Sequence, residues 1–272
     1  MARIGLWIDD PPSHVRKASY WKEVKRHGIQ VAAIMLESAG PGLDSKYTVE
    51  DLKKIREYAV EKHDIELVLT LWPQPTKQYL DELEEKLPGY VVASGCSAVE
   101  VDLEGNWRKS KDVKGFANLD KAGDRLVEIL KAVRDKYDVR IEVTTFPGHP
   151  ENTKRADVAP HADRLLPQAY SVRNRDVGLI EWDGKYGPGS MQRWTLDLAR
   201  TVPGEQKLSC GLAAYDQVWP GKTGQEAMQV AYDAAVAYGV EEVRYWSSKW
   251  VLGVRKNGYA SKFLLSLKKG TS

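Results

Sequence analysis

Three carboxylic acids alternate with aliphatic residues in one short stretch of the chain, Glu100-Val101-Asp102-Leu103-Glu104. In a β-strand, successive side chains point to opposite faces, so the three acids would share one face at a spacing of about 6.6 Å. At an effective dielectric constant of about 20, two charges at this spacing repel by roughly 2.5 kcal/mol, which is close to two pKa units. At least one of the acids is therefore expected to hold a proton at neutral pH, as general-acid catalysis requires.

The stretch that carries these acids belongs to a regular alternation of two sequence patterns. Short apolar runs predict eight strands, at residues 4–9, 29–36, 65–72, 98–104, 140–146, 165–171, 208–215 and 242–247. Segments with helical spacing or helix-forming residues follow them, among them 49–62, 76–87, 119–137, 190–201, 225–238 and 260–267. Thr48 stands directly before the first of these helices, and Asp51 is placed to complete a capping box with it.

Strands that alternate with helices pair in parallel, and eight such units are expected to close into a barrel. The length of 272 residues agrees with the ~250 that this fold usually needs. No Gly-x-Gly-x-x-Gly motif follows the first strand, which disfavours an open dinucleotide-binding sheet. We therefore predict an α/β protein, a single (β/α)₈ TIM barrel, whose residues 1–272 form one catalytic domain.

In such a barrel, alternate residues of each strand face the lumen, and active sites lie at the C-terminal ends of the strands. Because Val99, Val101 and Leu103 form a helix-facing set, the three acids between them are predicted to face the lumen. Other polar and aromatic residues are expected to bind substrate near them: Asp9, Glu37, Trp72, Gln168, Tyr215, Tyr245 and Trp246, together with Tyr170. Aromatic rings stack well on sugars, so this set favours glycoside hydrolysis over phosphate chemistry.

A competing interpretation places the three acids in structural ion pairs, because buried carboxylates are costly without partners. Arg140, at the base of the fifth predicted strand, is the one basic residue that we expect near them. Further sugar platforms could come from Trp107, Trp219 and Trp250, and His149 is expected to lie in a loop at the active face.

Composition excludes several classes of protein. The 40 basic and 38 acidic residues give a net charge of +2, which disfavours a nucleic-acid-binding surface. Two distant cysteines make a disulfide framework improbable, and the five histidines lack metal-ligand spacing, so we expect no cofactor and no metal. Neither an apolar run of about 20 residues nor a secretory signal is found, so we predict no membrane insertion and a cytoplasmic location as synthesised.

The acidic strand resembles the signature of family 18 glycoside hydrolases, the chitinases and their relatives, which is Asp-Gly-x-Asp-x-Asp-x-Glu. Residues 97–104 keep its last Asp and Glu, replace the middle Asp by Glu100 and lack the leading Asp-Gly. Gln168-Ala169-Tyr170 is similar to the family's Gln-x-Tyr, with Ser171 where Asn or Asp is usual. Residues 245–250, Tyr-Trp-Ser-Ser-Lys-Trp, resemble the eighth strand of plant class III chitinases.

This resemblance implies a (β/α)₈ barrel and a role for each matched residue. Glu104 would protonate the leaving glycosidic oxygen, and Asp102 would orient the N-acetyl group of the substrate, whose carbonyl oxygen attacks the anomeric carbon. Tyr170 would hold that acetyl group, and Glu100 would tune Asp102. This substrate-assisted route is a known exception to the scheme with two protein carboxylates.

Family 25 lysozymes, common as phage endolysins, are a second resemblance. They also have an Asp at the end of the first strand and Asp-x-Glu on the fourth, to which Asp9 and Asp102-Leu103-Glu104 are similar. Their Asp-x-Ser on the first strand is absent here, because Pro11 follows Asp10.

We therefore predict a glycosidase, a monomeric endo-β-N-acetylhexosaminidase whose polysaccharide substrate is peptidoglycan rather than chitin. As an endolysin it would act on the cell wall. The alternatives are a chitinase acting on chitin oligomers, a non-catalytic carbohydrate-binding barrel, and a metal-dependent enzyme with Asp9, Glu37, Asp102 and Glu104 as oxygen ligands. Retention of Glu104 favours catalysis over mere binding.

Overall fold

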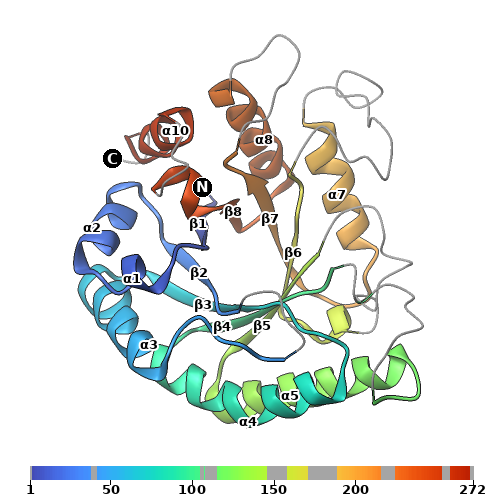
Figure 1. Cartoon of the computed structure of the whole chain (residues 1–272). Helices are drawn as coiled ribbons and strands as arrows, with labels where there is room; N and C mark the ends of the chain where they lie inside the picture. Colours follow the sequence, from blue (N-terminus) through green and yellow to red (C-terminus); the bar gives the residue numbers. More distant parts are fainter. Residues whose placement is uncertain are drawn as a thin grey trace.

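The computed structural model describes residues 2–37, 42–104, 107, 115–145, 158–170, 189–215, 224–252 and 258–269. Within them, eight parallel strands close into a barrel in sequence order (Figure 1). The strands are β1 (Arg3–Ile8), β2 (Val31–Met35), β3 (Glu66–Leu71), β4 (Ala98–Asp102), β5 (Arg140–Thr145), β6 (Arg164–Pro167), β7 (Lys207–Ala213) and β8 (Glu242–Trp246). The predicted (β/α)₈ barrel is confirmed, with all eight strands at the predicted places.

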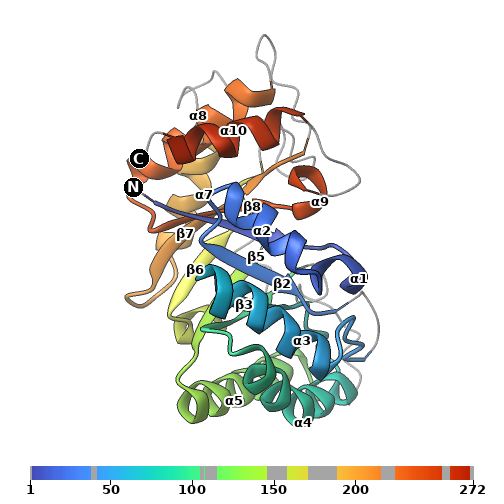
Figure 2. The ribbon, with the colours of Figure 1, turned by 90° about the vertical axis from the view of Figure 1, so that its left-hand side faces the viewer.

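Helices surround the ring of strands, as two views at right angles show (Figures 1 and 2). Those described are α1 (Pro12–Val15), α2 (Ala18–Arg26), α3 (Val49–Arg56), α4 (Lys77–Ser94), α5 (Leu119–Tyr137), α7 (Ser190–Arg200), α8 (Gly224–Tyr238), α9 (Ser248–Val251) and α10 (Gly258–Lys269). The π-helical turn η1 (Glu57–Glu61) extends α3, and the 3₁₀ turn η3 (Ala159–His161) precedes β6. Among the described helices, none has both the length and the apolarity to cross a bilayer.

Helix α4 is longer than predicted. The expected end at residue 87 is wrong, because the helix continues through Pro88 to Ser94. Proline disfavours a helix interior by removing a hydrogen bond and crowding the preceding turn. Here the residues beyond it include Val91 and Ala93, whose buried side chains pack in the core and stabilise the last turns.

Two apolar layers show which strand residues face inward. The larger layer lies between strands and helices and contains Val99, Val101 and Leu103. The smaller one fills the lumen with Trp7, Val31, Ala33, Val68, Ala98 and Leu166. Since Ala98 of β4 belongs to the lumen layer, the alternating residues 100, 102 and 104 follow it on that side, as the sequence predicts.

Thr48 begins α3 with the predicted capping box. The Asp51 amide donates to Thr48 Oγ1 and the Thr48 amide donates to Asp51 Oδ2, both at 3.1 Å. We expect Thr48→Ala to lower the free energy of unfolding by about 0.5–2 kcal/mol, because the first turn loses an acceptor. Urea denaturation measures this, with exposed Lys54→Ala on the same helix as the control. An equal loss in both variants would contradict the prediction.

Candidate active site

Asp102 and Glu104 form a hydrogen-bonded pair of acids at the C-terminal end of β4. Asp102 is buried and Glu104 is half-buried. Burial raises the pKa of Asp102 well above its usual range, and the negative charges of Glu104 and Glu100 raise it further, against a lowering hydrogen bond from Gln168. These surroundings therefore favour a proton on the pair, whose second member, Glu104, is half-buried.

Gln168 and Tyr170, just beyond β6, complete the surroundings of this pair. The Gln168 amide nitrogen lies 3.2 Å from each carboxylate oxygen of Asp102, which fixes the orientation of the acid. The Gln168 amide oxygen is buried and has no hydrogen-bond partner among the described residues. Burial and the charge of Asp102 raise the pKa of Tyr170, so its phenol keeps its proton as a hydrogen-bond donor.

A row of aromatic rings extends from the acids across this end of the barrel. It comprises Trp246, Trp7, Tyr170, Tyr215 and Trp250, with successive ring centroids 6.0–6.3 Å apart. All but Trp7 are half-buried. The row joins residues of β1, β8 and α9 with Tyr170 and Tyr215, which follow β6 and β7. It offers aromatic rings of the kind that bind sugars.

Glu37 and Trp72 stand beside each other after β2 and β3. The Trp72 backbone N–H donates to Glu37 Oε1 at 2.9 Å, and the Tyr79 hydroxyl of α4 donates to the same oxygen. Burial raises the pKa of Glu37 from its ordinary value of 4.5 to about 7, although both hydrogen bonds and the charge of Lys46 lower it. Glu37 is therefore a second acid at this end of the barrel whose pKa is raised.

The raised pKa of Glu37 predicts a pH dependence of stability. Between pH 4.5 and about 7 the folded protein keeps the proton that the unfolded chain releases, so stability falls as the pH rises. A shift from 4.5 to about 7 corresponds to roughly 3 kcal/mol above pH 7. We expect Glu37→Gln to flatten the loss of stability between pH 5 and 8, as urea denaturation at several pH values would show. Glu50→Gln, with a 73% exposed side chain, should leave the slope unchanged.

Asp9 lies at the end of β1 in contact with two cations. Its carboxylate oxygens lie 3.2 Å from Lys46 Nζ and 2.6 Å from Lys249 Nζ. Its backbone N–H donates to the Ser248 hydroxyl at 3.0 Å. The predicted substrate-binding residue therefore belongs to a lysine-bridged group on the rim of the barrel.

Glu100 differs from the other two acids, because it lies fully buried in an ion-pair network. Arg244 Nη1 contacts Glu100 Oε2, and the same guanidinium contacts Glu142 at 2.9 Å and Glu242 at 2.7 Å. The Trp7 indole N–H donates to Glu100 Oε1 at 2.8 Å. Our expectation that only Arg140 would lie near the acids is wrong, because β8 carries an arginine into the lumen.

The proton affinity of Glu100 follows from this sharing. Burial raises the pKa of Glu100 to about 7; the charge of Arg244 opposes the rise, and the charges of Glu142 and Glu242 add to it. The three carboxylates therefore share the guanidinium of Arg244. For Glu100, the structural interpretation of the acids is correct, although its charge still acts on Asp102 above it.

Two glycines leave the room that this network and the aromatic row need. A Cβ atom on Gly5 would lie 2.8 Å from Glu242 Oε1, and one on Gly211 would lie 2.9 Å from the Trp7 ring. Any larger residue at either place would displace a buried charged or aromatic side chain.

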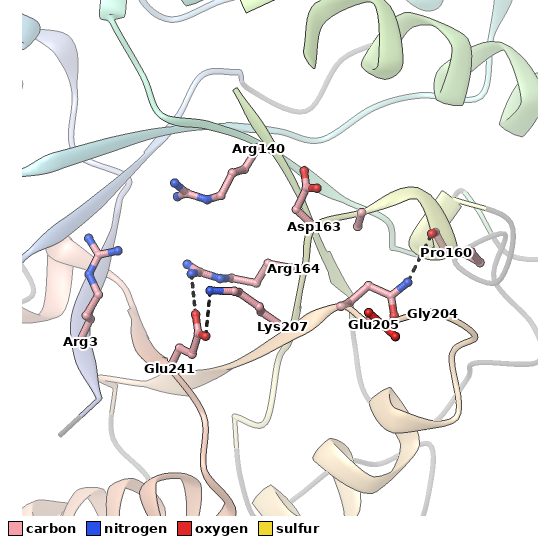
Figure 3. A pocket seen from close by; sticks show the side chains of 11 residues that line it. Arg3, Arg140, Pro160, Asp163, Arg164, Gly204, Glu205, Lys207 and Glu241 are labelled. Atoms are coloured by element: carbon pink, nitrogen blue, oxygen red, sulfur yellow. Dashed lines mark hydrogen bonds and ion pairs between the residues drawn. The ribbon is translucent and has the colours of Figure 1, made fainter. Parts of the chain in front are cut away.

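At the opposite end of the barrel, a cavity of about 630 Å³ is lined by Arg3, Arg140, Arg164 and Lys207 (Figure 3). These cations have carboxylate partners. Glu241 lies 3.3 Å from Arg164 and 3.0 Å from Lys207, while Glu66 contacts the other two arginines. The charges of these side chains balance, and the cavity lies at the N-terminal ends of the strands. We therefore interpret these residues as a structural ion-pair cluster rather than as a ligand site.

Tyr245 does not face the lumen, so its predicted place in the site is wrong. Its buried ring packs on Phe263 of α10, with centroids 6.1 Å apart, in the layer between strands and helices. Its neighbours Arg244 and Trp246 take the inward positions on either side of it in β8. Trp107 is also no sugar platform, since it is fully buried and donates to the Pro73 carbonyl at 2.6 Å. Trp219, His149 and Ser171 lie outside the described residues.

Comparison with known proteins gives structural relatives but no sequence relatives. No protein-family model and no curated protein matches the sequence. A group IV chitinase of Ostrinia furnacalis superposes with a TM-score of 0.67 at 8% identity, covering 100% of both chains. A family 18 N-acetylglucosaminidase from Paenibacillus barengoltzii gives 0.62 at 11% identity, covering 99% of this chain and 100% of its own. This chain therefore has the same barrel fold as these two enzymes.

A spore cortex-lytic enzyme of Bacillus cereus has the same barrel, with a TM-score of 0.61 at 11% identity over 97% of this chain and 73% of its own. At these identities the similarity concerns the fold alone, and function must be argued from the site. These comparisons give no support to the resemblance to family 25 lysozymes.

Asp9, Glu37, Asp102 and Glu104 do not form a metal site. In the described part of the chain, no group of three or more His, Cys, Asp or Glu side chains is arranged to hold a metal ion. Asp9 and Glu37 are instead engaged by lysines and by Tyr79, respectively.

Sequence reasoning missed Arg244, Glu142, Glu242 and Arg164 of the lumen network and Tyr79 beside Glu37. A signal for the network exists in β5 and β8, where Arg140-Ile141-Glu142 and Glu242-Val243-Arg244 alternate charged with aliphatic residues as β4 does. Tyr79 leaves no such signal, because it reaches Glu37 from a helix.

Proposed function

We propose that this protein is a glycoside hydrolase that cleaves β-1,4 bonds of an N-acetylhexosamine polymer, with Glu104 as general acid. The observation that carries the proposal is the proton-holding pair of Asp102 and Glu104 at the catalytic end of the barrel, beside Tyr170 and a row of aromatic rings. The whole chain, residues 1–272, would serve as one catalytic domain.

The proposed mechanism follows from the chemistry of this pair. Glu104 donates its proton to the glycosidic oxygen as the bond to the anomeric carbon breaks. The acetamido oxygen of the substrate attacks the same carbon, and Asp102 and Tyr170 hold that group. Water then opens the cyclic intermediate, and the Glu104 carboxylate accepts its proton, which retains the anomeric configuration. The resemblance of residues 97–104 and 168–170 to family 18 glycoside hydrolases supports these roles.

Glu100 stands where that family has an aspartate, and its role is proposed accordingly. Anchored by Arg244 and Trp7, it would act on Asp102 through its charge rather than by sharing a proton. Tyr215, Trp246 and Gln168 would bind sugar rings and their substituents, and Asp9 would contact the substrate at the rim of the barrel.

Peptidoglycan is the substrate that we propose first and chitin the second. Barrels of both a cortex-lytic enzyme and chitinases superpose on this one, which is why both polymers belong in the test. Purified protein should be incubated with peptidoglycan and with chitin oligomers, and the products identified by mass spectrometry. The sugar at the new reducing end identifies the glycosidic bond that was cleaved. Sugar binding without products over a broad pH range would instead indicate a carbohydrate-binding barrel.

A further inference from the structure

Glu37, Trp72 and Asp102 belong to one row across three neighbouring strands. In the parallel register, Met35 pairs with Thr70 and Leu71 pairs with Val101, so the next residues bring Trp72 beside Asp102. Neighbouring strands lie about 4.8 Å apart, and Trp72 therefore stands between the two acids. Its position continues the inward face of β3, on which Val68 packs in the lumen.

The indole N–H of Trp72 is a donor without an acceptor in the part of the chain that the structure describes. Its Nε1 atom is buried and has no hydrogen-bond partner among the described residues. An indole nitrogen can only donate, and buried donors in native proteins are nearly always satisfied. A ligand oxygen would satisfy this one. The unpaired amide oxygen of Gln168 on the other side of Asp102 offers the complementary acceptor.

The backbone of Trp72 is held in place by a hydrogen bond to Glu37. Glu37 Oε1 accepts both the Trp72 backbone N–H at 2.9 Å and the Tyr79 hydroxyl of α4. Only 7% of Glu37 is exposed, so the acid is packed in place. Helix α4 thus reaches, through two hydrogen bonds, the residue next to the catalytic pair.

We propose that Trp72 binds a hydroxyl or amide oxygen of the sugar beside Asp102 through its indole N–H, and that Glu37 and Tyr79 are positioning residues for it. The inference rests on the proposed function and adds a specificity residue to it. Ligands that lack an oxygen at this point lose the contact.

Calorimetric binding of chitotetraose and of a peptidoglycan tetrasaccharide to the Glu104→Gln protein tests this. Adding Trp72→Phe keeps an aromatic ring but removes the five-membered ring with its N–H, and should raise Kd about tenfold. Its melting temperature should fall less than that of a Trp→Phe variant whose N–H is satisfied, because removing an unsatisfied buried donor offsets part of the lost packing. Trp21→Phe is the matched control, since that N–H is satisfied by the Val15 carbonyl at 2.6 Å. It should lower the melting temperature and leave Kd unchanged.

Glu37 variants test the positioning role by rescue. Glu37→Gln keeps the acceptor oxygen and should bind within about twofold of the parent, whereas Glu37→Leu should lose about as much affinity as Trp72→Phe. An unchanged Kd in Trp72→Phe, or equal Kd values in the two Glu37 variants, would overturn the inference while leaving the hydrolase proposal intact. If the parent binds neither oligosaccharide and the wild type cleaves neither, both proposals fail.

Discussion

Glu104→Gln is expected to lower kcat by about 10²–10⁴-fold, the usual contribution of a general acid. Glutamine has nearly the same shape, but it cannot give a proton to the leaving oxygen, so KM should change far less than kcat. Reducing-end release from the polymer identified in the substrate test measures the loss. The melting temperature should stay close to that of the wild type, because the side chain is only half-buried.

Two further variants make this result specific. Asp102→Asn should also lose most of its activity, since Asp102 shares the hydrogen bond with Glu104 and is held by Gln168. Glu128→Gln on α5, with a 67% exposed side chain, should keep full activity. Wild-type turnover by the Glu104→Gln protein would remove Glu104 from the mechanism.

Arg244→Met is expected to have the largest effect on stability. It would leave Glu100, Glu142 and Glu242 without their shared cation inside the barrel, and Arg164 would partner only the last two. Breaking a buried ion pair by removing one partner costs about 3–5 kcal/mol. At about 2–4 °C per kcal/mol for a protein of this size, the melting temperature should fall by roughly 6–20 °C.

Scanning calorimetry checks the loss, and a surface pair provides the comparison. Arg26→Met removes the partner of Glu23 at the exposed end of α2 and should not change the melting temperature measurably. Glu100→Gln should partly restore the Arg244→Met protein, because it removes one of the charges left unpaired. A melting temperature of Arg244→Met equal to that of the wild type would show that the lumen tolerates the loss of this cation, contrary to the prediction.

The ion-pair network in the lumen and the candidate active site above it have different roles. The lower layers of the lumen, from Glu66 and Arg140 up to the fully buried Arg244, pair acids with cations, so they hold the strands in one arrangement. The upper layer holds Asp102, whose burial and acidic neighbours favour its protonated form. Among the described residues, it leaves Trp72 and Gln168 with unpaired polar atoms. The acid pair and the row of aromatic rings thus lie at the end where ligands enter barrel enzymes.

Local patterns in the sequence were sufficient for the barrel and for the orientation of β4. A strand alternates its faces with a period of two, so Val99, Val101 and Leu103 determine where Glu100, Asp102 and Glu104 point. The ends of α5 and the cap at Thr48 depend on neighbouring residues only, and both agree with the prediction.

Contacts between distant strands were decided only by the tertiary structure. From the sequence alone, Glu100 was predicted to be a catalytic acid. Closure of the barrel brings Arg244, 144 residues away, into contact with it. Tyrosine occurs on both faces of a strand, so the sequence did not determine the orientation of Tyr245. Its packing on Phe263 places it on the outer face. The acidic strand by itself determined that a proton would be shared, because that follows from spacing along one chain. Which acids share it depends on charges that closure of the barrel brings from other strands.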